Sequence, residues 1–227
     1  MIHYHGTPIT PRARLFMLGG RNFCVPHSDP RDLAACLAVG QSVMLDNGAF
    51  SAWTRGAAPD WPAYYDWVAP VLSPVHWAVV PDVIDGDGPA NDRLAAQWPH
   101  RREWAGVVWH LHEPLDRLAA LADAWPRICF GSSGDYRDPG SDRWRARIDA
   151  AWNLLVRRGA SPWTHMLRAM DQASAGPWPF ASADSTNLAR NHAAAPDPER
   201  MAARIDTRNP PTVWASRHEQ MEMLDVA

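Results

Sequence analysis

The chain has 227 residues, of which 46% are hydrophobic and 21% are charged, proportions typical of a globular protein with a sizeable core and unlike those of a disordered chain. Its formal net charge is −3, so contact with nucleic acid would depend on a local basic patch rather than on the overall field. All 22 basic residues are arginine, which excludes a lysine Schiff base and a phosphate-loop lysine.

Short apolar runs bounded by Gly, Pro, Asp or Asn predict buried strands. In chain order they are residues 2–5, 15–18, 42–45, 76–81, 106–111, 127–131, 164–170 and 180–183. Apolar residues with helical spacing predict helices at residues 30–39, 114–124, 142–158 and 198–205. This alternation predicts an α/β fold with a parallel sheet, and at this length a compact, somewhat irregular (β/α)8 TIM-like barrel. No GxGxxG motif follows the first strand, which disfavours a dinucleotide-binding fold.

The absence of membrane, secretion and disulfide signals indicates the compartment in which the protein resides. No run approaches the roughly 18 apolar residues that a membrane helix needs, and the N-terminal residues lack the layout of a signal peptide. Cys24, Cys36 and Cys129 are widely spaced and form neither a disulfide framework nor a zinc motif. We therefore expect a single domain over residues 1–227 in a reducing cytoplasm, with no membrane partner, no metal and no cofactor.

Carboxylates recur where the predicted strands end. Asp46, Asp82 and Asp184 each follow an apolar run, and in a barrel these ends meet at one mouth. Any one of them could simply cap the next helix. Three together favour chemistry, because paired carboxylates at a sugar's anomeric carbon divide the work as nucleophile and general acid. The sequence therefore indicates glycosyl transfer.

Other residues beside these carboxylates suit a flat ligand. Gly48, Gly131 and Gly134 would let the backbone approach such a ligand closely. Phe50 and Tyr136 could stack on a base, although a packing role is as compatible with their positions.

The motifs resemble those of a known family. Residues 46–50 (DNGAF) are similar to the Asp-Ser-Gly-Gly-Phe motif of tRNA-guanine transglycosylases, and residues 131–134 (GSSG) to the glycine-rich turn that receives the base. Residues 165–168 (HMLR) resemble the His-Tyr-Leu strand of that family. Residues 184–191 (DSTNLARN) resemble the segment that begins with its nucleophilic aspartate.

The short phage branch of the family, whose members insert 7-deazaguanine bases into DNA, is more similar still. Residues 4–8 (YHGTP), 81–86 (PDVIDG) and 182–186 (SADST) are typical of that branch. The resemblance runs in order from residue 4 to about residue 192.

The resemblance implies an exchange of guanine in a nucleic acid for a free 7-deazaguanine base such as 7-cyano-7-deazaguanine. Asp184 would attack C1′ and form a covalent intermediate, Asp46 would be the general acid and base, and Asp82 would bind the N1/N2 edge of the base. The implied substrate-binding residues are Asp82, Asn47, Gly48, Phe50, Ser132, Ser133, Gly134 and His165. A base must leave the helix to be reached, so base flipping or a single-stranded substrate is expected.

Two departures from the family favour DNA over tRNA as the polymer. The tRNA enzymes carry a zinc site of three cysteines and a histidine near the C-terminus, whereas no cysteine follows Cys129 here. The chain is also too short for their tRNA-gripping insertions. Basic residues at Arg143, Arg145, Arg147 and Arg190 are candidate phosphate contacts, although a solvated helix face explains the first three equally well.

Four alternatives stay open at this point. His110-x-His112 has the spacing of a metal-binding pair on a strand, repeated in His3-x-His5 and joined by His165, and so a metal-dependent barrel hydrolase is the main rival. Capture of the intermediate by water would make the protein a nucleoside or DNA glycosidase. The same barrel could also act on tRNA or only bind nucleic acid, and a homodimer or a partner protein is neither indicated nor excluded.

Overall fold

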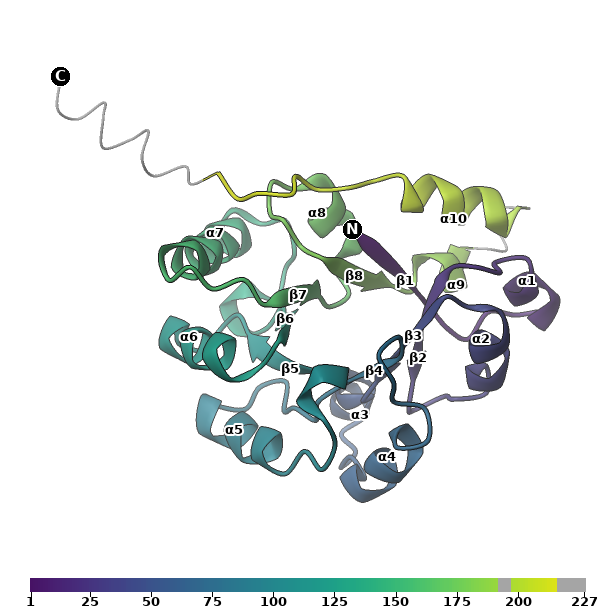
Figure 1. Cartoon of the computed structure of the whole chain (residues 1–227), viewed down its shortest axis with the longest axis horizontal. Helices are drawn as coiled ribbons and strands as arrows, with labels where there is room; N and C mark the ends of the chain where they lie inside the picture. Colours follow the sequence, from purple (N-terminus) through teal and green to yellow (C-terminus); the bar gives the residue numbers. More distant parts are fainter. Residues whose placement is uncertain (192–196, 216–227) are drawn as a thin grey trace, which may run out of the picture.

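The computed structural model describes residues 1–191 and 197–215, and it contains a closed barrel of eight parallel strands surrounded by helices (Figure 1). The strands are β1 (Ile2–Gly6), β2 (Asn22–Pro26), β3 (Ser42–Asp46), β4 (Trp77–Val79), β5 (Ala105–His110), β6 (Arg127–Gly131), β7 (Trp163–Met166) and β8 (Ser182–Ser185). Each strand pairs with the next along the chain, and β8 pairs with β1 to close the barrel. The predicted (β/α)8 fold is confirmed.

The helices within the described ranges lie outside the strands. They are α1 (Arg12–Phe16), α2 (Leu33–Val39), α3 (Ala49–Thr54), α4 (Trp61–Val68), α5 (Gly88–Ala96), α6 (Leu115–Ala124), α7 (Asp142–Arg157), α8 (Met170–Ala175), α9 (Asn187–Asn191) and α10 (Pro198–Asp206), with 3-10 turns η1 (Arg102–Trp104) and η2 (Gly134–Tyr136). Asp60, Asp87, Ser141 and Asp197 each begin a helix by accepting a hydrogen bond from the third backbone N–H that follows. The predicted domain also includes residues 192–196 and 216–227, which lie outside the described residues.

The prediction of a strand at residues 15–18 is wrong, and the second strand is instead Asn22–Pro26. Leu15 belongs to α1, and together with Leu18 it is fully buried, a spacing of three that suits a helical turn. The sequence NFCVP of β2 begins and ends with residues that usually break strands. Two other boundaries differ: β7 ends at Met166, and β8 starts at Ser182, so Asp184 lies within its strand.

Alternate residues of each strand face opposite sides of the barrel wall. The buried residues of one cluster face the barrel interior: Tyr4, Cys24, Met44, Trp77, Val79, Val108 and Cys129. Their neighbours along the strands belong to a larger cluster that packs the wall against the helices, for example Phe23, Val25, Leu45, Trp109 and Phe130. The strands are therefore apolar on both faces, as their continuous apolar runs predict.

The amino end of the barrel interior is filled by aromatic side chains and one arginine. The Trp77 indole donates a hydrogen bond to the Tyr4 hydroxyl at 2.9 Å. The guanidinium of Arg127, on the first residue of β6, lies 4.5 Å from the ring of Trp77 and 4.2 Å from that of Trp163. Because this end is filled, a ligand can reach the interior only from the carboxyl end.

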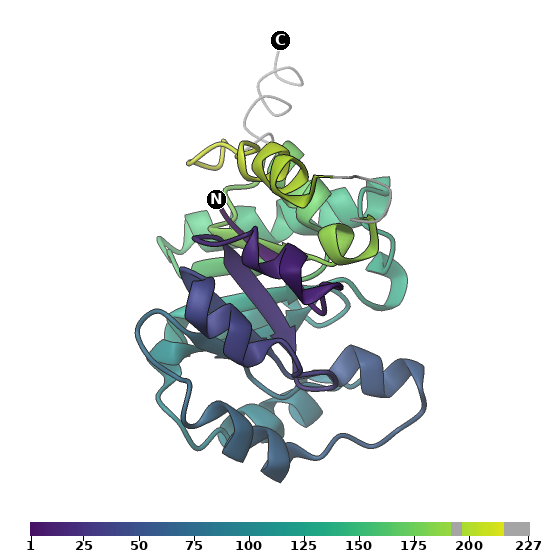
Figure 2. The same cartoon turned by 90° about the vertical axis from the view of Figure 1, so that its right-hand side faces the viewer.

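The C-terminal described segment lies against the first strand, so that α10 runs beside β1 and the N-terminus (Figures 1 and 2). His5 Nε2 on β1 donates to Asp206 Oδ1 at 3.0 Å, and Arg21 Nε donates to Asp206 Oδ2 at 3.1 Å. Further along, the Trp214 indole donates to Asn153 Oδ1 of α7 at 2.7 Å. This segment thus ties the two ends of the barrel sequence together.

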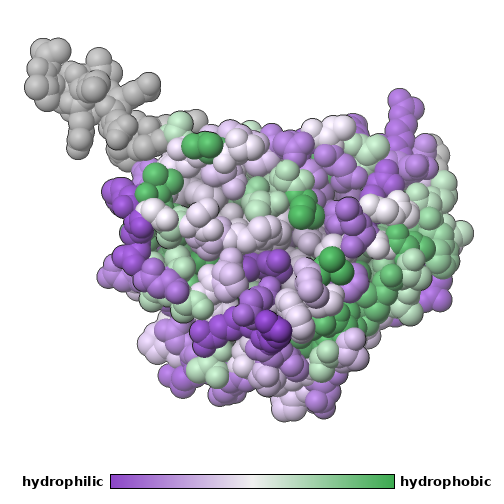
Figure 3. All heavy atoms as spheres, in the orientation of Figure 1, coloured by the Kyte–Doolittle hydropathy of each residue, from purple (hydrophilic) through white to green (hydrophobic). Residues whose placement is uncertain are grey.

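The outer surface seen in Figure 3 is mostly hydrophilic or mixed, with hydrophobic residues gathered on the right-hand side over α2. Within the described ranges, no helix combines the length and hydropathy that crossing a bilayer requires.

Candidate active site

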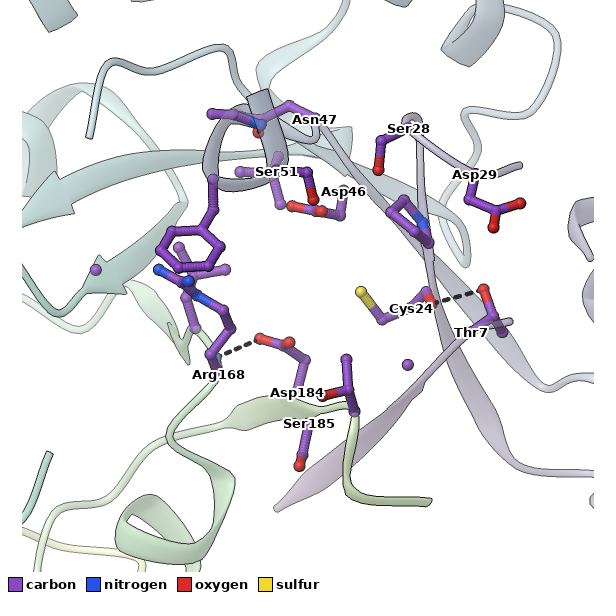
Figure 4. Close-up of a pocket in the computed structure, with 18 of the residues that line it drawn as sticks. Thr7, Cys24, Ser28, Asp29, Asp46, Asn47, Ser51, Arg168, Asp184 and Ser185 are labelled. Atoms are coloured by element: carbon purple, nitrogen blue, oxygen red, sulfur yellow. Dashed lines mark hydrogen bonds between the residues drawn. The ribbon is translucent and has the colours of Figure 1, made fainter. Parts of the chain in front are cut away.

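A cavity of about 860 Å³ opens at the carboxyl end of the barrel. Asp46 from β3, Asp82 after β4 and Asp184 from β8 all line it, together with His110 and Arg168. Figure 4 shows Asp46 and Asp184 on opposite sides of the opening, both directed into it. The three carboxylates that the sequence singled out are therefore brought into one cavity, at the end where barrel enzymes hold their chemistry.

Asp184 is fixed through one of its two carboxylate oxygens. Its Oδ1 accepts a hydrogen bond from the backbone N–H of Arg168 at 2.8 Å and another from His165 Nε2 at 3.2 Å. Arg168 adopts φ 60°, and among the described residues it is the one non-glycine residue with positive φ. Such backbone strain is kept only where the surrounding structure enforces it, and here it directs the N–H of Arg168 at the carboxylate.

Asp46 lies in a different electrostatic environment. Burial raises the pKa of its carboxyl to about 7, and the charges of Asp184 and Asp82 add to the effect. Arg168 and a hydrogen bond from the backbone of Gly48 act in the opposite direction. Gly48 can supply that bond because it turns the chain with φ 74° at the start of α3. Asp46 therefore keeps its proton to a much higher pH than an ordinary carboxyl does.

Asp82 is held by two neighbours. Asn47 Nδ2 donates to Asp82 Oδ1 at 2.7 Å, and His110 Nε2 donates to Asp82 Oδ2 at 2.8 Å. Asn47 also donates to the carbonyl of Val80 and accepts from the backbone of Ala49. Both amide donors of Asn47 are thus used inside the protein, so the structure assigns it to positioning Asp82 rather than to contact with a ligand.

His110 is itself supported by a buried network. Its backbone N–H donates to Glu113 Oε2 at 2.8 Å, and the same oxygen accepts from Arg117 at 2.6 Å. Its Nδ1 is buried and has no partner among the described residues. A methyl group at Gly131 would lie only 2.8 Å from this Nδ1, so glycine there leaves room for the histidine ring.

The histidine pairs proposed as metal ligands do not converge. His112 uses Nδ1 to accept from Ser133 and Nε2 to donate to the carbonyl of Gly86, while His110 is bound to Asp82. His3 and His5 face Asp206 outside the barrel wall. Across residues 1–191 and 197–215, no group of three or more His, Cys, Asp or Glu residues has metal-binding geometry. This donor arrangement disfavours the metal-dependent hydrolase.

Ser132, Ser133 and Gly134 line a second cavity of about 520 Å³ that adjoins the first. The Ser132 hydroxyl accepts from the Trp144 indole at 2.9 Å, and the Ser133 hydroxyl bonds to His112 at 2.6 Å. The two cavities share lining residues Phe50, Ile84, Leu167 and Arg168. The implied base-binding residues are therefore divided between two neighbouring spaces.

The side chains of Arg168 and Phe50 stack on each other at the boundary between the two cavities. The guanidinium carbon of Arg168 lies 3.4 Å from the centre of the Phe50 ring, and both side chains are exposed. One face of the Phe50 ring, which was predicted to stack on a base, is thus covered by Arg168. Among the described contacts, the guanidinium has no carboxylate within ion-pair distance, so no ion pair fixes it there.

His165 and Cys24 lie deeper than a ligand contact would require. His165 is fully buried and lines neither cavity, because it sits behind Asp184. Cys24 lines the first cavity, but burial raises the pKa of its thiol well above the usual value, and the charges of Asp184 and Asp46 raise it further. A neutral thiol is a poor nucleophile, so this environment does not activate Cys24.

The predicted basic residues are dispersed. Arg190 on α9 is exposed and lines the first cavity. Arg143 is exposed and pairs with Asp135 at 3.3 Å, and Arg145 donates to the carbonyl of Gly140. Arg147, in contrast, donates to the carbonyls of Leu111 and Glu113 and braces the chain after β5. The patch that the sequence suggests on α7 therefore lacks Arg147.

Sequence reasoning gave no role to Arg168 and considered His110 only as a metal ligand. Nothing in the sequence marks Arg168, since its importance comes from a left-handed backbone and from a contact with Phe50, 118 positions earlier in the chain. His110 ends an apolar strand, the same signal that identified Asp46.

The sequence matches no protein-family model, and no curated protein is significantly similar to it. The chemistry must therefore be argued from the cavity itself. That cavity combines a carboxylate held by two donors with a carboxyl that keeps a proton near neutral pH, the combination that displacement at a sugar carbon requires.

Proposed function

We propose that this protein is a guanine transglycosylase that replaces guanine in DNA by a 7-deazaguanine base. The observation that carries the proposal is the contrast between Asp184, held by Arg168 and His165, and Asp46, whose pKa is raised to about 7 in the same cavity. Asp184 is suited to attack as a nucleophile, and Asp46 is suited to donate a proton. The ordered resemblance to guanine transglycosylases supports the same reaction.

In the first half of the proposed reaction, an oxygen of the Asp184 carboxylate forms a bond to C1′ of the guanine nucleotide. The bond from C1′ to N9 breaks, and its electron pair passes to the base. Asp46 gives its proton to the departing guanine, which leaves as a neutral molecule. The sugar remains linked to Asp184 and the nucleic-acid backbone stays intact.

In the second half, the incoming 7-deazaguanine loses its N9 proton to the Asp46 carboxylate. The electron pair of N9 then forms a bond to C1′, and the bond to Asp184 breaks. Asp184 is again a carboxylate and Asp46 again carries a proton, so protons and charge balance over the cycle. Two displacements give retention at C1′.

The base is proposed to bind across the boundary of the two cavities. Asp82 and His110 line one side of that boundary, and Ser133 and Gly134 line the other. A planar ring could stack on the face of Phe50 that borders both cavities only after the Arg168 guanidinium leaves that face. We therefore expect Arg168 to move when a base binds.

DNA is proposed as the polymer because the chain lacks the cysteines of the tRNA enzymes' zinc site. Arg190 at the rim of the first cavity is the best-placed candidate for a phosphate contact, and Arg143 lies farther out at the start of α7. With a net charge of −3, such local contacts would have to carry the attraction to DNA.

The decisive experiment is a base-exchange assay with radiolabelled guanine and 7-cyano-7-deazaguanine. Single-stranded DNA, duplex DNA and tRNA are offered in parallel to wild type and to Asp184→Asn. We expect label to enter DNA with the wild type only, and a protein–DNA adduct to be seen on denaturing gels with the wild type only.

Each other outcome has a defined meaning. Label in tRNA alone would keep the chemistry and overturn the choice of polymer. Release of guanine without uptake of label would identify a glycosidase. Full activity of Asp184→Asn, or neither exchange nor release with any polymer, would refute the proposed function. His3→Leu serves as the control, since His3 is buried on the outer side of β1 and lines neither cavity.

A further inference from the structure

His165 forms a continuous hydrogen-bonded chain with its neighbours on β7 and β8. Its Nδ1 lies 2.6 Å from the hydroxyl oxygen of Ser182, and its Nε2 lies 3.2 Å from Oδ1 of Asp184. Ser182 and Asp184 are two residues apart on β8, so both point into the barrel interior on the same side of the wall. His165 and Ser182 are completely buried.

The positions of the protons in this chain follow from the partners. A carboxylate can only accept, so the nitrogen facing Asp184 must carry the hydrogen. Nδ1 is then the acceptor of a neutral ring, and the Ser182 hydroxyl is the donor that it needs. Asp184 therefore selects the tautomer of His165, and the Ser182 hydroxyl satisfies the Nδ1 atom of that tautomer.

The surroundings keep this imidazole neutral and immobile. The Trp163 ring is parallel to it within 8° at 6.2 Å, and the rings of Trp77 and Tyr4 meet it in T-shaped contacts at 5.2 and 5.9 Å. Burial lowers the pKa of His165 and the nearby charge of Arg127 lowers it further, while Asp184 acts in the opposite direction.

Both donors of Asp184 reach the same oxygen. The backbone N–H of Arg168 and Nε2 of His165 bond to Oδ1, and no described residue bonds to Oδ2. Oδ1 is therefore engaged on the protein side, and Oδ2 is the oxygen with free electron pairs.

We propose that Ser182 and His165 are positioning residues that hold Asp184 by Oδ1 and so present Oδ2 as the attacking oxygen. The inference rests on the proposed function, since it specifies how the nucleophile of that reaction is oriented. His165 touches neither the base nor the sugar and exchanges no proton with them.

The kinetic test compares four variants: His165→Leu, His165→Gln, Ser182→Ala and the control His3→Leu. A misplaced nucleophile costs about 100-fold in rate, so we expect kcat of His165→Leu to fall by about that factor while KM for DNA and for the base changes less than about twofold. His165→Gln, whose amide can donate to Oδ1, should recover about tenfold of the loss.

Ser182→Ala should retain the fold, because it removes one oxygen. It should lower kcat by about tenfold, because the His165 ring loses the hydrogen bond that holds its Nδ1. Thermal unfolding of every variant shows whether the barrel is intact. Unchanged kcat in both His165→Leu and Ser182→Ala, or a fall that appears in KM alone, would overturn the inference.

A second measurement separates this inference from the proposed function. Nitrogen-15 NMR of labelled histidine at pH 7 should show His165 as the neutral tautomer with its hydrogen on Nε2, and Ser182→Ala should change the chemical shift of Nδ1, which loses its donor. A charged ring or a hydrogen on Nδ1 would overturn the inference whatever the activity. Wild type without base exchange, but with the expected tautomer, would refute the reaction while leaving the hydrogen-bonded chain supported.

Discussion

At the scale of single residues, the ionised carboxyl of Asp46 is energetically unfavourable in the folded protein. It is directed into a cavity that also holds Asp82 and Asp184, and burial together with those charges raises its pKa to about 7. A carboxyl in an unfolded chain has a pKa near 3.8. The folded protein therefore binds a proton that the unfolded chain has already released over the range between these two values.

The sign of the stability effect follows directly. The Asp46 contribution is fully present below about pH 4, is lost as pH rises, and levels off above about pH 7. One pKa unit is worth about 1.4 kcal/mol, so the loss reaches at most about 4 kcal/mol. Asp46→Asn cannot ionise, and we expect it to exceed wild type in free energy of unfolding at pH 8 but not at pH 4. Urea unfolding at both pH values measures this, and an equal difference at both would contradict it.

The same proton governs the proposed release of guanine. A general acid acts only while protonated, so the single-turnover rate of guanine release should fall about tenfold per pH unit above pH 7. Rapid-quench measurements from pH 5.5 to 9 test this. A flat profile over that range would exclude Asp46 as the acid, and Asp46→Asn should remove both the activity and the pH dependence.

At the scale of elements, the sequence predicted most strands because each is a short apolar run buried on both faces. The strand prediction failed at residues 15–18. Leu15 and Leu18 are buried there because they pack from a helical turn, not from a strand. The sequence did not predict β2, because its end residues Asn22 and Pro26 are of types that usually interrupt strands. They are part of the strand here because they pair with β1 and β3.

The candidate site shows the same division. Asp46, Asp82 and Asp184 could be found from the ends of strands, because topology alone brings those ends together. The use of Asn47 to hold Asp82, the position of His165 behind Asp184 and the contact of Arg168 with Phe50 depend on side-chain geometry. No local pattern in the sequence encodes such contacts.

Helix α3 carries two exposed aromatic rings to the mouth of the barrel. Phe50 and Trp53 lie 5.7 Å apart, and both line the second cavity. Stacking of an unpaired base on an aromatic ring is worth about 1–3 kcal/mol, so we expect Trp53→Ala to weaken binding of single-stranded DNA by about 10- to 100-fold. Fluorescence anisotropy measures this. Phe16→Ala, an equally exposed ring that lines neither cavity, is the matched control, and equal effects of both would contradict the prediction.

At the scale of the whole molecule, the carboxylate of Asp206 joins α10 to the start of the barrel. Asp206 accepts from His5 and Arg21, and it also faces His3. Burial alone would raise the pKa of Asp206, but these partners together lower it. The cluster joins a late part of the chain to the first strand.

Removal of that carboxylate should loosen this junction. We expect Asp206→Asn to lower the free energy of unfolding by about 1–3 kcal/mol, because buried donors of β1 lose their charged acceptor. The control Asp123→Asn breaks an exposed pair with Arg158 and should cost less than about 1 kcal/mol. Calorimetry at pH 7 measures both. Similar losses in the two variants would mean that the cluster contributes no more than a surface pair.

The closing strand of the barrel also carries the proposed nucleophile. Asp184 lies on β8, which follows β7 in the barrel and closes it by pairing with β1, about 180 residues earlier in the chain. During synthesis, an incomplete chain can therefore contain the folded wall from β1 to β7 and still have no carboxylate able to attack. A protein with the proposed chemistry would thus be inert on the ribosome because of its order of strands, and would acquire reactivity in the step that completes its fold.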